Sequence, residues 1–204
     1  MAKTGCDVMD KLVGSYQGLT LVYGVASAGK TTLAKIAAIE LIKEGKVIFL
    51  DTENGFNASR IKQLTSEFKN VISKVIVINA KNFYHQHKAI MDIWSIKGVS
   101  LVVVDTIGAH YRVYVKKDYK KANLILRKQV NVLKELSRKI PVIMATQVYS
   151  DIKTGMLKPI GGKIVTGSSD MVIRLEKSPR RVVIEKPFVK DALFEICEKG
   201  IFSI

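Results

Sequence analysis

The chain has 204 residues, enough for one sizeable hydrophobic core, and we expect a single domain over residues 1–204. Hydrophobic residues make up 48% of it and charged residues 25%, which excludes the composition of a disordered chain. The formal net charge is +15, from 33 Lys and Arg against 18 Asp and Glu. This charge favours a polyanionic partner, first of all nucleic acid, with a Lys-rich surface of no binding function as the alternative.

Cysteines and apolar runs indicate the compartment. Cys6 and Cys197 are far apart and form no zinc or disulfide pattern, which favours a reducing environment. The N-terminus has no apolar signal core, and no apolar run approaches the roughly 18 residues of a membrane span. We expect a cytoplasmic, nucleoid-associated protein with no membrane partner.

Short apolar runs alternate with helical patterns along the chain. Because the runs are nearly continuous, they are typical of parallel strands buried on both faces. The expected strands are Leu19–Tyr23, Val47–Leu50, Val75–Ile78, Leu101–Val104 and Val142–Ala145. Residues 31–44 and 122–139 carry apolar residues at helical spacing. The sequence therefore predicts an α/β fold with a mostly parallel, twisted central sheet flanked by helices.

The last part of the chain has a different pattern. Met171–Leu175, Arg181–Glu185 and Ala192–Ile196 are short, partly alternating segments separated by turn residues such as Ser178 and Pro179. Such segments are typical of antiparallel strands, which we expect at the C-terminal edge of the sheet.

A phosphate-binding pattern, G-x-x-x-x-G-K-T, follows the first expected strand and opens the first expected helix. Its glycines permit a close backbone approach to phosphate, and the helix N-terminus favours an anion. The lysine can reach the β- and γ-phosphates, and the threonine hydroxyl can ligate Mg²⁺. We expect ATP with Mg²⁺ to be bound by Gly24, Val25, Ala26, Ser27, Ala28, Gly29, Lys30, Thr31 and Thr32.

Three further strands end in polar side chains. Asp105 ends a buried apolar strand and is a candidate Mg²⁺ ligand beside Thr31, or else a helix N-cap. Glu53 follows the second strand and is a candidate general base, or else an acid that only balances the basic surface. Gln147 follows another strand and is a candidate sensor of the γ-phosphate.

These features resemble the RecA/RadA recombinase superfamily, most closely its short archaeal RadA paralogues, including the RadB type. The likeness covers nearly the whole chain. Besides the phosphate loop, it rests on residues 5–12, Asp51 to Glu53 with Phe56 and Arg60, Asp105 with Tyr111 and Arg112, Gln147 with Val148, and residues 158–162.

The resemblance implies a RecA-like P-loop ATPase core in which Glu53 activates water and Asp105 serves the metal. It also implies that Arg60 packs near the adenine and that Gln147 links the nucleotide to DNA. The segments after Tyr111 and after Val148 resemble the two DNA-facing loops of the family.

The segment after Tyr111 has the composition expected for single-stranded DNA. Cations can bind phosphates and rings can stack on bases, although a solvated helix start whose tyrosines pack on the core is the alternative. The candidate DNA-binding residues are Tyr111, Arg112, Tyr114, Lys116, Lys117, Tyr119, Lys120 and Lys121, with Lys153 and Lys158 in the second segment and Lys163 after it.

Departures from the family limit what the resemblance implies. The sequence begins at the ATPase core, so we expect no helical N-terminal DNA-binding domain and no upstream Phe-x-x-Ala segment. Lys186 precedes Pro187 where the recombinases carry an acidic residue.

The leading hypothesis is a DNA-binding ATPase, slow or DNA-stimulated, accessory to homologous recombination and DNA repair. Its expected partners are DNA, preferentially single-stranded, and the main recombinase or other paralogues. The alternatives are a nucleotide-gated regulator of a recombinase that does not hydrolyse ATP, and a KaiC-like signalling ATPase that has no nucleic-acid partner.

Overall fold

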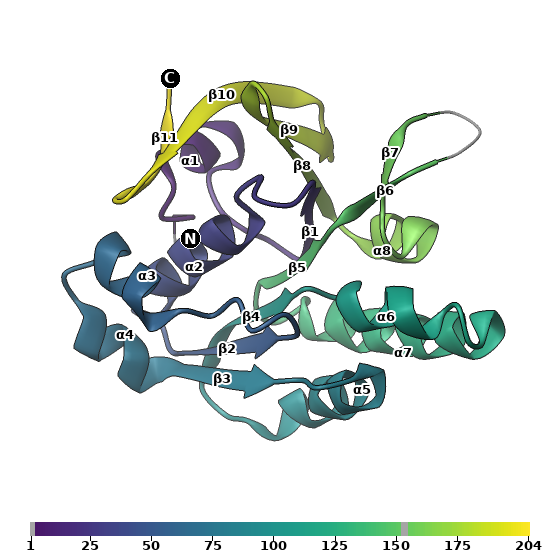
Figure 1. Ribbon diagram of the computed structural model, residues 1–204. Helices are drawn as coiled ribbons and strands as arrows, with labels where there is room; N and C mark the ends of the chain where they lie inside the picture. Colours follow the sequence, from purple (N-terminus) through teal and green to yellow (C-terminus); the bar gives the residue numbers. More distant parts are fainter. Residues whose placement is uncertain (1–2, 152–154) are drawn as a thin grey trace.

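The computed structural model describes residues 3–151 and 155–204, and its centre is a nine-stranded sheet in the order β11-β10-β9-β8-β1-β5-β4-β2-β3 (Figure 1). The strands of this sheet are β1 (Leu19–Gly24), β2 (Lys46–Asp51), β3 (Val75–Asn79), β4 (Val99–Asp105), β5 (Val142–Thr146), β8 (Met171–Lys177), β9 (Arg180–Lys186), β10 (Lys190–Cys197) and β11 (Gly200–Ser203). A separate two-stranded hairpin is formed by β6 (Val148–Ser150) and β7 (Leu157–Pro159).

Strand directions divide the large sheet into two parts. The six strands from β8 to β3 in the sheet order pair in parallel, whereas β9, β10 and β11 continue the sheet in antiparallel pairs. The predicted α/β fold, with a mostly parallel sheet and antiparallel strands at its C-terminal edge, is confirmed.

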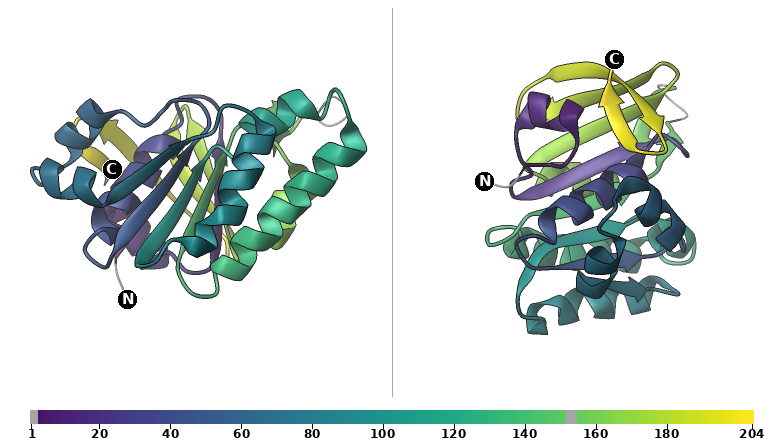
Figure 2. Two further views of the ribbon diagram at one scale, coloured as in Figure 1. Left: turned by 90° about the horizontal axis from the view of Figure 1, so that it is seen from below. Right: turned by 90° about the vertical axis from the view of Figure 1, so that its left-hand side faces the viewer.

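Helices cover both faces of the parallel part, as Figure 2 shows. One group of helices consists of α1 (Asp7–Val13), α2 (Lys30–Leu41), α3 (Ala58–Leu64) and α4 (Phe68–Lys74). The other consists of α5 (Phe83–Asp92), α6 (Ala109–Tyr114), α7 (Tyr119–Leu136) and α8 (Gly162–Ser168), with the short 3₁₀ turn η1 (Ile93–Ser95) after α5. Buried residues of the first group pack on one face of the sheet, and those of the second group pack on the other face.

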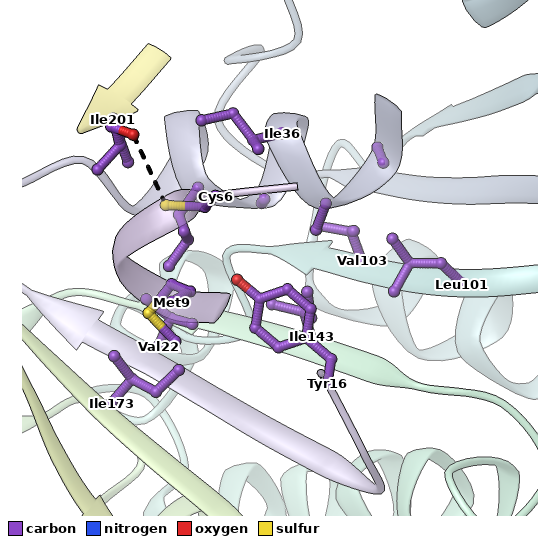
Figure 3. Packing of buried hydrophobic residues seen from close by; sticks show 14 of the residues in the cluster. Cys6, Met9, Tyr16, Val22, Ile36, Leu101, Val103, Ile143, Ile173 and Ile201 are labelled. Carbon is purple, nitrogen blue, oxygen red and sulfur yellow. Dashed lines mark hydrogen bonds between the residues drawn. The ribbon is translucent and has the colours of Figure 1, made fainter. Parts of the chain in front are cut away.

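The alternation of side chains along β4 shows why this sheet needs helices on both faces. Leu101 and Val103 point into the layer of α1 to α4, and Val102 and Val104 point into the layer of α5 to α8. Figure 3 shows side chains of the first of these layers, among them Leu101 and Val103 of β4 and Ile36 of α2. Because successive residues of the strand point into opposite apolar layers, the strand requires a continuous apolar run.

The segment after Tyr111 differs from the loop that the resemblance implies. Residues 109–114 form α6, residues 115–118 form a turn, and α7 begins at Tyr119. The Asp118 side chain accepts a hydrogen bond from the Lys121 N–H, so it caps α7. This helix also starts three residues earlier than the expected segment 122–139 and ends three residues earlier, at Leu136.

Candidate nucleotide site and nucleic-acid groove

Three strands bring their carboxyl ends to one edge of the sheet. In the parallel register, Asp51 of β2 lies opposite Asp105 of β4, and Asp105 lies opposite Ala145 of β5. Gln147 follows two residues after Ala145. Because parallel strands end together, these polar residues and the loop after β1 lie at the same edge of the sheet.

The loop between β1 and α2 contains the predicted phosphate-binding residues, and Thr32 follows in the first turn of α2. Two glycines flank this loop, and a side chain at Gly24 would clash with fixed backbone, whereas one at Gly29 would require the end of an isoleucine side chain to move. A Cβ atom on Gly24 would lie 2.3 Å from the Leu175 carbonyl oxygen, and one on Gly29 would lie 2.8 Å from Ile196 Cδ1. Gly29 also has a φ of 110°, in the left-handed region, and directly precedes α2. The backbone of β8 and a side chain of β10 therefore hold this loop in place.

Lys30 lies inside the loop, with only 7% of its surface exposed. Its Nζ donates hydrogen bonds to the carbonyl oxygens of Gly24, at 2.9 Å, and Val25, at 2.7 Å. Burial lowers the pKa of Lys30, and the nearby Asp105 and Glu53 carboxylates oppose this shift. The ammonium group is thus held by neutral acceptors only, which an anionic phosphate can replace with a stronger bond.

Thr31 and Asp105 form a contact that fits a divalent cation. The Thr31 hydroxyl donates to Asp105 Oδ2 at 2.7 Å, while Asp105 Oδ1 is buried and has no hydrogen-bond partner among the described residues. Burial raises the pKa of Asp105, and the Asp51 and Glu53 carboxylates raise it further, against the Thr31 bond and the Lys30 charge. A bare buried oxygen beside a hydroxyl is a suitable ligand pair for Mg²⁺, which takes its other oxygens from phosphate and water.

The described residues contain no group of three or more His, Cys, Asp or Glu side chains that could hold a metal without other ligands.

The loop that carries Glu53 is held by two buried charges. Asp51 accepts hydrogen bonds from the N–H groups of Glu53, Gly55 and Phe56, at 3.1, 3.0 and 2.7 Å. Lys35 of α2, which is 3% exposed, donates to the Gly55 carbonyl at 2.8 Å. Asp51 thus organises this loop. Lys35 was missed because its position in α2 carries no motif.

Glu53 itself is exposed and contacts Gln147. Gln147 Nε2 donates to Glu53 Oε1 at 2.8 Å, and Gln147 Oε1 accepts a hydrogen bond from Arg112 Nη1 at 3.2 Å. An amide therefore joins the carboxylate predicted as general base to an arginine predicted to bind DNA.

A groove of about 980 Å³ opens beside this chain of contacts, between α6, α7, β6 and α8. Figure 1 shows these elements on the same side of the molecule. Five cations line the groove and none of its described lining residues is acidic. The predicted DNA-binding residues in it are Tyr111, Arg112, Lys116, Tyr119, Lys120 and Lys163. Arg127 was missed, although it lies seven residues after Lys120 and so on the same face of α7.

The other predicted DNA-binding residues lie elsewhere. Lys121 lies 5.6 Å from the ring centroid of Tyr84, outside the groove lining, and Lys117 does not line the groove either. Lys158 is paired with Asp151 at 2.5 Å. Lys153 lies outside the described residues.

Two of the three tyrosines of this segment pack inward. Tyr111 is buried and meets Phe83 edge to face, with ring centroids 6.1 Å apart. Tyr114 packs on Phe83 and Tyr84, at 5.5 and 5.4 Å. These contacts agree with the core-packing alternative for both rings. Tyr119, by contrast, is 70% exposed and free to stack.

Two arginines connect the C-terminal strands to the rest of the chain, Arg60 to α3 and Arg180 to the phosphate loop. Arg60 donates to the carbonyl oxygens of Cys197, at 2.8 Å, and Glu198, at 3.0 Å, in the turn between β10 and β11. Arg180, at the start of β9, donates to the Ser27 carbonyl of the phosphate loop at 3.2 Å. The position of Arg60 near an adenine stays a prediction, and Arg180 was not predicted because hairpin contacts have no local sequence signal.

The sheet order, the glycine-rich loop between β1 and α2 and the acidic ends of β2 and β4 define a RecA-like P-loop ATPase core. A family model described as Rad51 matches residues 1–204, and the chain belongs to the Rad51 family.

Relatives and a solved structure agree with this assignment. A protein named DNA repair and recombination protein RadB from Thermococcus sibiricus is 37% identical and covers 100% of this chain and 96% of its own. The protein of the same name from Methanocaldococcus jannaschii is 33% identical over 90% of this chain and 92% of its own. A structure titled "Crystal structure of the RadB recombinase" matches with a TM-score of 0.85 and 33% identity over 100% of both chains. Among the described residues, no helix is long and apolar enough to cross a membrane.

Proposed function

We propose that this chain is an ATP-binding, single-stranded-DNA-binding accessory protein of homologous recombination and DNA repair. Nucleotide occupancy controls its grip on the DNA of the nucleoid. The observation that carries the proposal is the shared location of two sites: the phosphate loop and the cationic groove lie at the same edge of the sheet and are joined through Gln147. The names of the RadB relatives support the role in recombination and repair. Partnership with the main recombinase or another paralogue belongs to the same proposal.

In the nucleotide site, Lys30 would exchange its carbonyl partners for the β- and γ-phosphates, and Thr31 and Asp105 would hold Mg²⁺. When bound, Mg²⁺ would neutralise part of the phosphate charge. Glu53 orients a water molecule and accepts its proton, and the loop tied down by Asp51 and Lys35 fixes the position of that carboxylate. Positioning and charge supply most of the rate enhancement in such a site.

In the groove, the cations bind the phosphates of a single strand. Five of them lie along one open surface, and Tyr119 and Tyr149 expose rings on which bases can stack. Recognition by charge and stacking is independent of sequence, as an accessory protein of DNA repair requires.

Phosphate release from Mg–ATP, with and without single-stranded DNA, tests the enzymatic part of this proposal. Glu53→Gln removes the proton acceptor but keeps the size of the side chain, so the rate should fall by about 10²- to 10⁴-fold while binding of a labelled ATP analogue persists. Glu195→Gln is the matched control, because Glu195 is exposed on β10 and has no contact with the site.

Equal rates of phosphate release for the wild type and Glu53→Gln, with and without DNA, would contradict hydrolysis by this site. That result would leave a nucleotide-gated regulator that binds ATP without cleaving it.

A further inference from the structure

Arg112 lies between the cationic groove and the candidate nucleotide site. Its side chain lines the cationic groove, and one of its Nη–H groups donates to Gln147 Oε1 at 3.2 Å. Its side chain is exposed, and no carboxylate among the described residues forms an ion pair with it. The guanidinium group is therefore held on the nucleotide side by a single neutral acceptor.

That neutral contact is weak compared with the bond that DNA offers. A guanidinium–phosphate pair is charge-assisted and often bidentate, roughly twice as strong as a hydrogen bond between neutral groups. Since Arg112 already faces the groove, a phosphate placed there competes directly with Gln147 for the same N–H groups.

Loss of the Arg112 contact changes what Gln147 can do. In the structure, the Gln147 amide is fixed at both ends, with Oε1 accepting from Arg112 and Nε2 donating to Glu53 Oε1. Without Arg112, the amide is free to rotate, and the Glu53 carboxylate is free to leave its amide partner. The pair then has two arrangements, one for an empty groove and one for an occupied groove.

We infer that Arg112 is the residue that reports DNA in the groove to the nucleotide site: it holds Gln147 on Glu53 when the groove is empty and releases both when a DNA phosphate takes its place. This inference rests on the proposed function, in which the groove binds DNA and Glu53 serves the nucleotide. Arg112 is thus a positioning residue that acts through Gln147.

The experiment measures the affinity for a labelled oligo-dT strand with and without a non-hydrolysable Mg–ATP analogue. The ratio of the two affinities is the coupling factor, and by linkage it has the same value when nucleotide affinity is measured with and without DNA. We expect the analogue to strengthen DNA binding by about tenfold in the wild type, within the usual range of such couplings.

Arg112→Met removes the donor and keeps a long, unbranched side chain at an exposed position, so the fold should persist and circular dichroism can check this. Its coupling factor should fall to near one. The matched variant Lys116→Met loses a groove cation that has no contact with Gln147, so it should bind DNA more weakly but keep the coupling factor. Gln147→Leu should also have a coupling factor near one, because it breaks the same connection. Adding Arg112→Met to Gln147→Leu should then weaken DNA binding without changing the coupling factor.

A coupling factor near ten in Arg112→Met would overturn the inference. So would a wild type that binds both DNA and the analogue with no coupling between them, and that result would leave the proposed binding functions intact. A wild type that binds no DNA, or no analogue, would overturn the proposed function itself and the inference with it.

Discussion

Asp105 is a buried carboxylate with one oxygen bonded to Thr31 and the other without a hydrogen-bond partner among the described residues. Such a group costs folding free energy, because burial disfavours its charged form. Its pKa is raised above the ordinary 3.8, first by burial. At low pH the acid is protonated and the cost is absent. The cost grows as the pH rises above 3.8 and is complete once the pH exceeds the raised folded-state pKa.

Asp105→Asn should therefore stabilise the nucleotide-free protein at pH 7, because the amide has no charge to desolvate. For a chain of this length, 1 kcal/mol corresponds to a Tm change of about 2–4 °C, and we expect a rise of about that size. The rise should shrink as the pH falls toward 3.8, because the wild-type acid is protonated below its raised pKa. Thermal unfolding with and without Mg–ATP measures both effects, since the variant should also lose the Mg–ATP-dependent increase in Tm. A lower Tm of Asp105→Asn at pH 7 without nucleotide would show that the charge supports the fold.

At the residue scale, the sequence predicted side chains that belong to motifs and missed those that act through contacts between distant segments. Lys30, Thr31, Glu53 and Asp105 stand at strand ends or in the phosphate loop, and the parallel pairing of the strands places these positions at one edge of the sheet. Lys35 holds the loop after β2 at the same edge, but its hydrogen bond to Gly55 joins α2 to a residue 20 positions away. Only the folded chain shows that contact.

Helix α7 places several of the basic side chains along the groove. Lys120 and Arg127 lie on its open face, whereas Ala122, Leu126 and Val130 are buried against the sheet. The amphipathic spacing fixes the helix on the core and so directs its cations to one side. The groove is then completed by α6 and α8.

The cations of this groove should make single-stranded DNA binding depend steeply on salt. Each phosphate contact on a single strand contributes about −0.7 to the slope of log K against log salt, so five contacts give about −3.5. Lys120→Ala should reduce the magnitude of the slope by about 0.7, because one contact is lost. Lys62→Ala, on α3 outside the groove, is the control and should leave the slope unchanged. A salt-independent affinity would contradict a phosphate-binding groove and favour a signalling ATPase with protein partners.

At the element scale, the buried strands were predicted well, whereas the helical conformation of the segment after Tyr111 was not. A run such as residues 101–104 must be a strand because both of its faces need apolar side chains. The segment after Tyr111 has mixed polarity, and its helix α6 depends on Tyr111 and Tyr114 packing against Phe83 of a different helix. The composition of the segment shows its cations and rings, but tertiary contacts determine which of these side chains are exposed.

The whole molecule places two binding sites at one edge of one sheet. The phosphate loop follows β1, Glu53 follows β2, and Gln147 leads from β5 into the hairpin β6–β7 that borders the groove. The two hydrogen bonds of Gln147 therefore connect Glu53, beside the phosphate loop, with Arg112 in the groove that we propose binds DNA. The C-terminal strands fix the loop from the other side through Arg180 and Ile196.

The parallel strands and the polar residues at their carboxyl ends could be predicted from the sequence, because buried runs and polar strand ends are local signals, whereas the order of the strands in the sheet was not predicted. The contacts of Arg60 with Cys197 and of Arg180 with Ser27 join residues more than 130 positions apart. No local pattern encodes such pairs, so the role of the C-terminal strands in shaping the nucleotide site emerged only from the structure.

The central claim is that nucleotide binding controls the grip on DNA, and titration of single-stranded DNA against the wild type and Lys30→Ala tests it most directly. Lys30→Ala removes the cation that the phosphates need, and Lys30 is buried in the loop, away from the groove lining. With a Mg–ATP analogue present, the wild type should bind DNA about tenfold more tightly than it does without nucleotide, a typical coupling between sites. Lys30→Ala should bind DNA equally with and without the analogue, at the nucleotide-free affinity of the wild type. A wild-type affinity that the analogue does not change, or a Lys30→Ala variant that responds to it as the wild type does, would contradict the account.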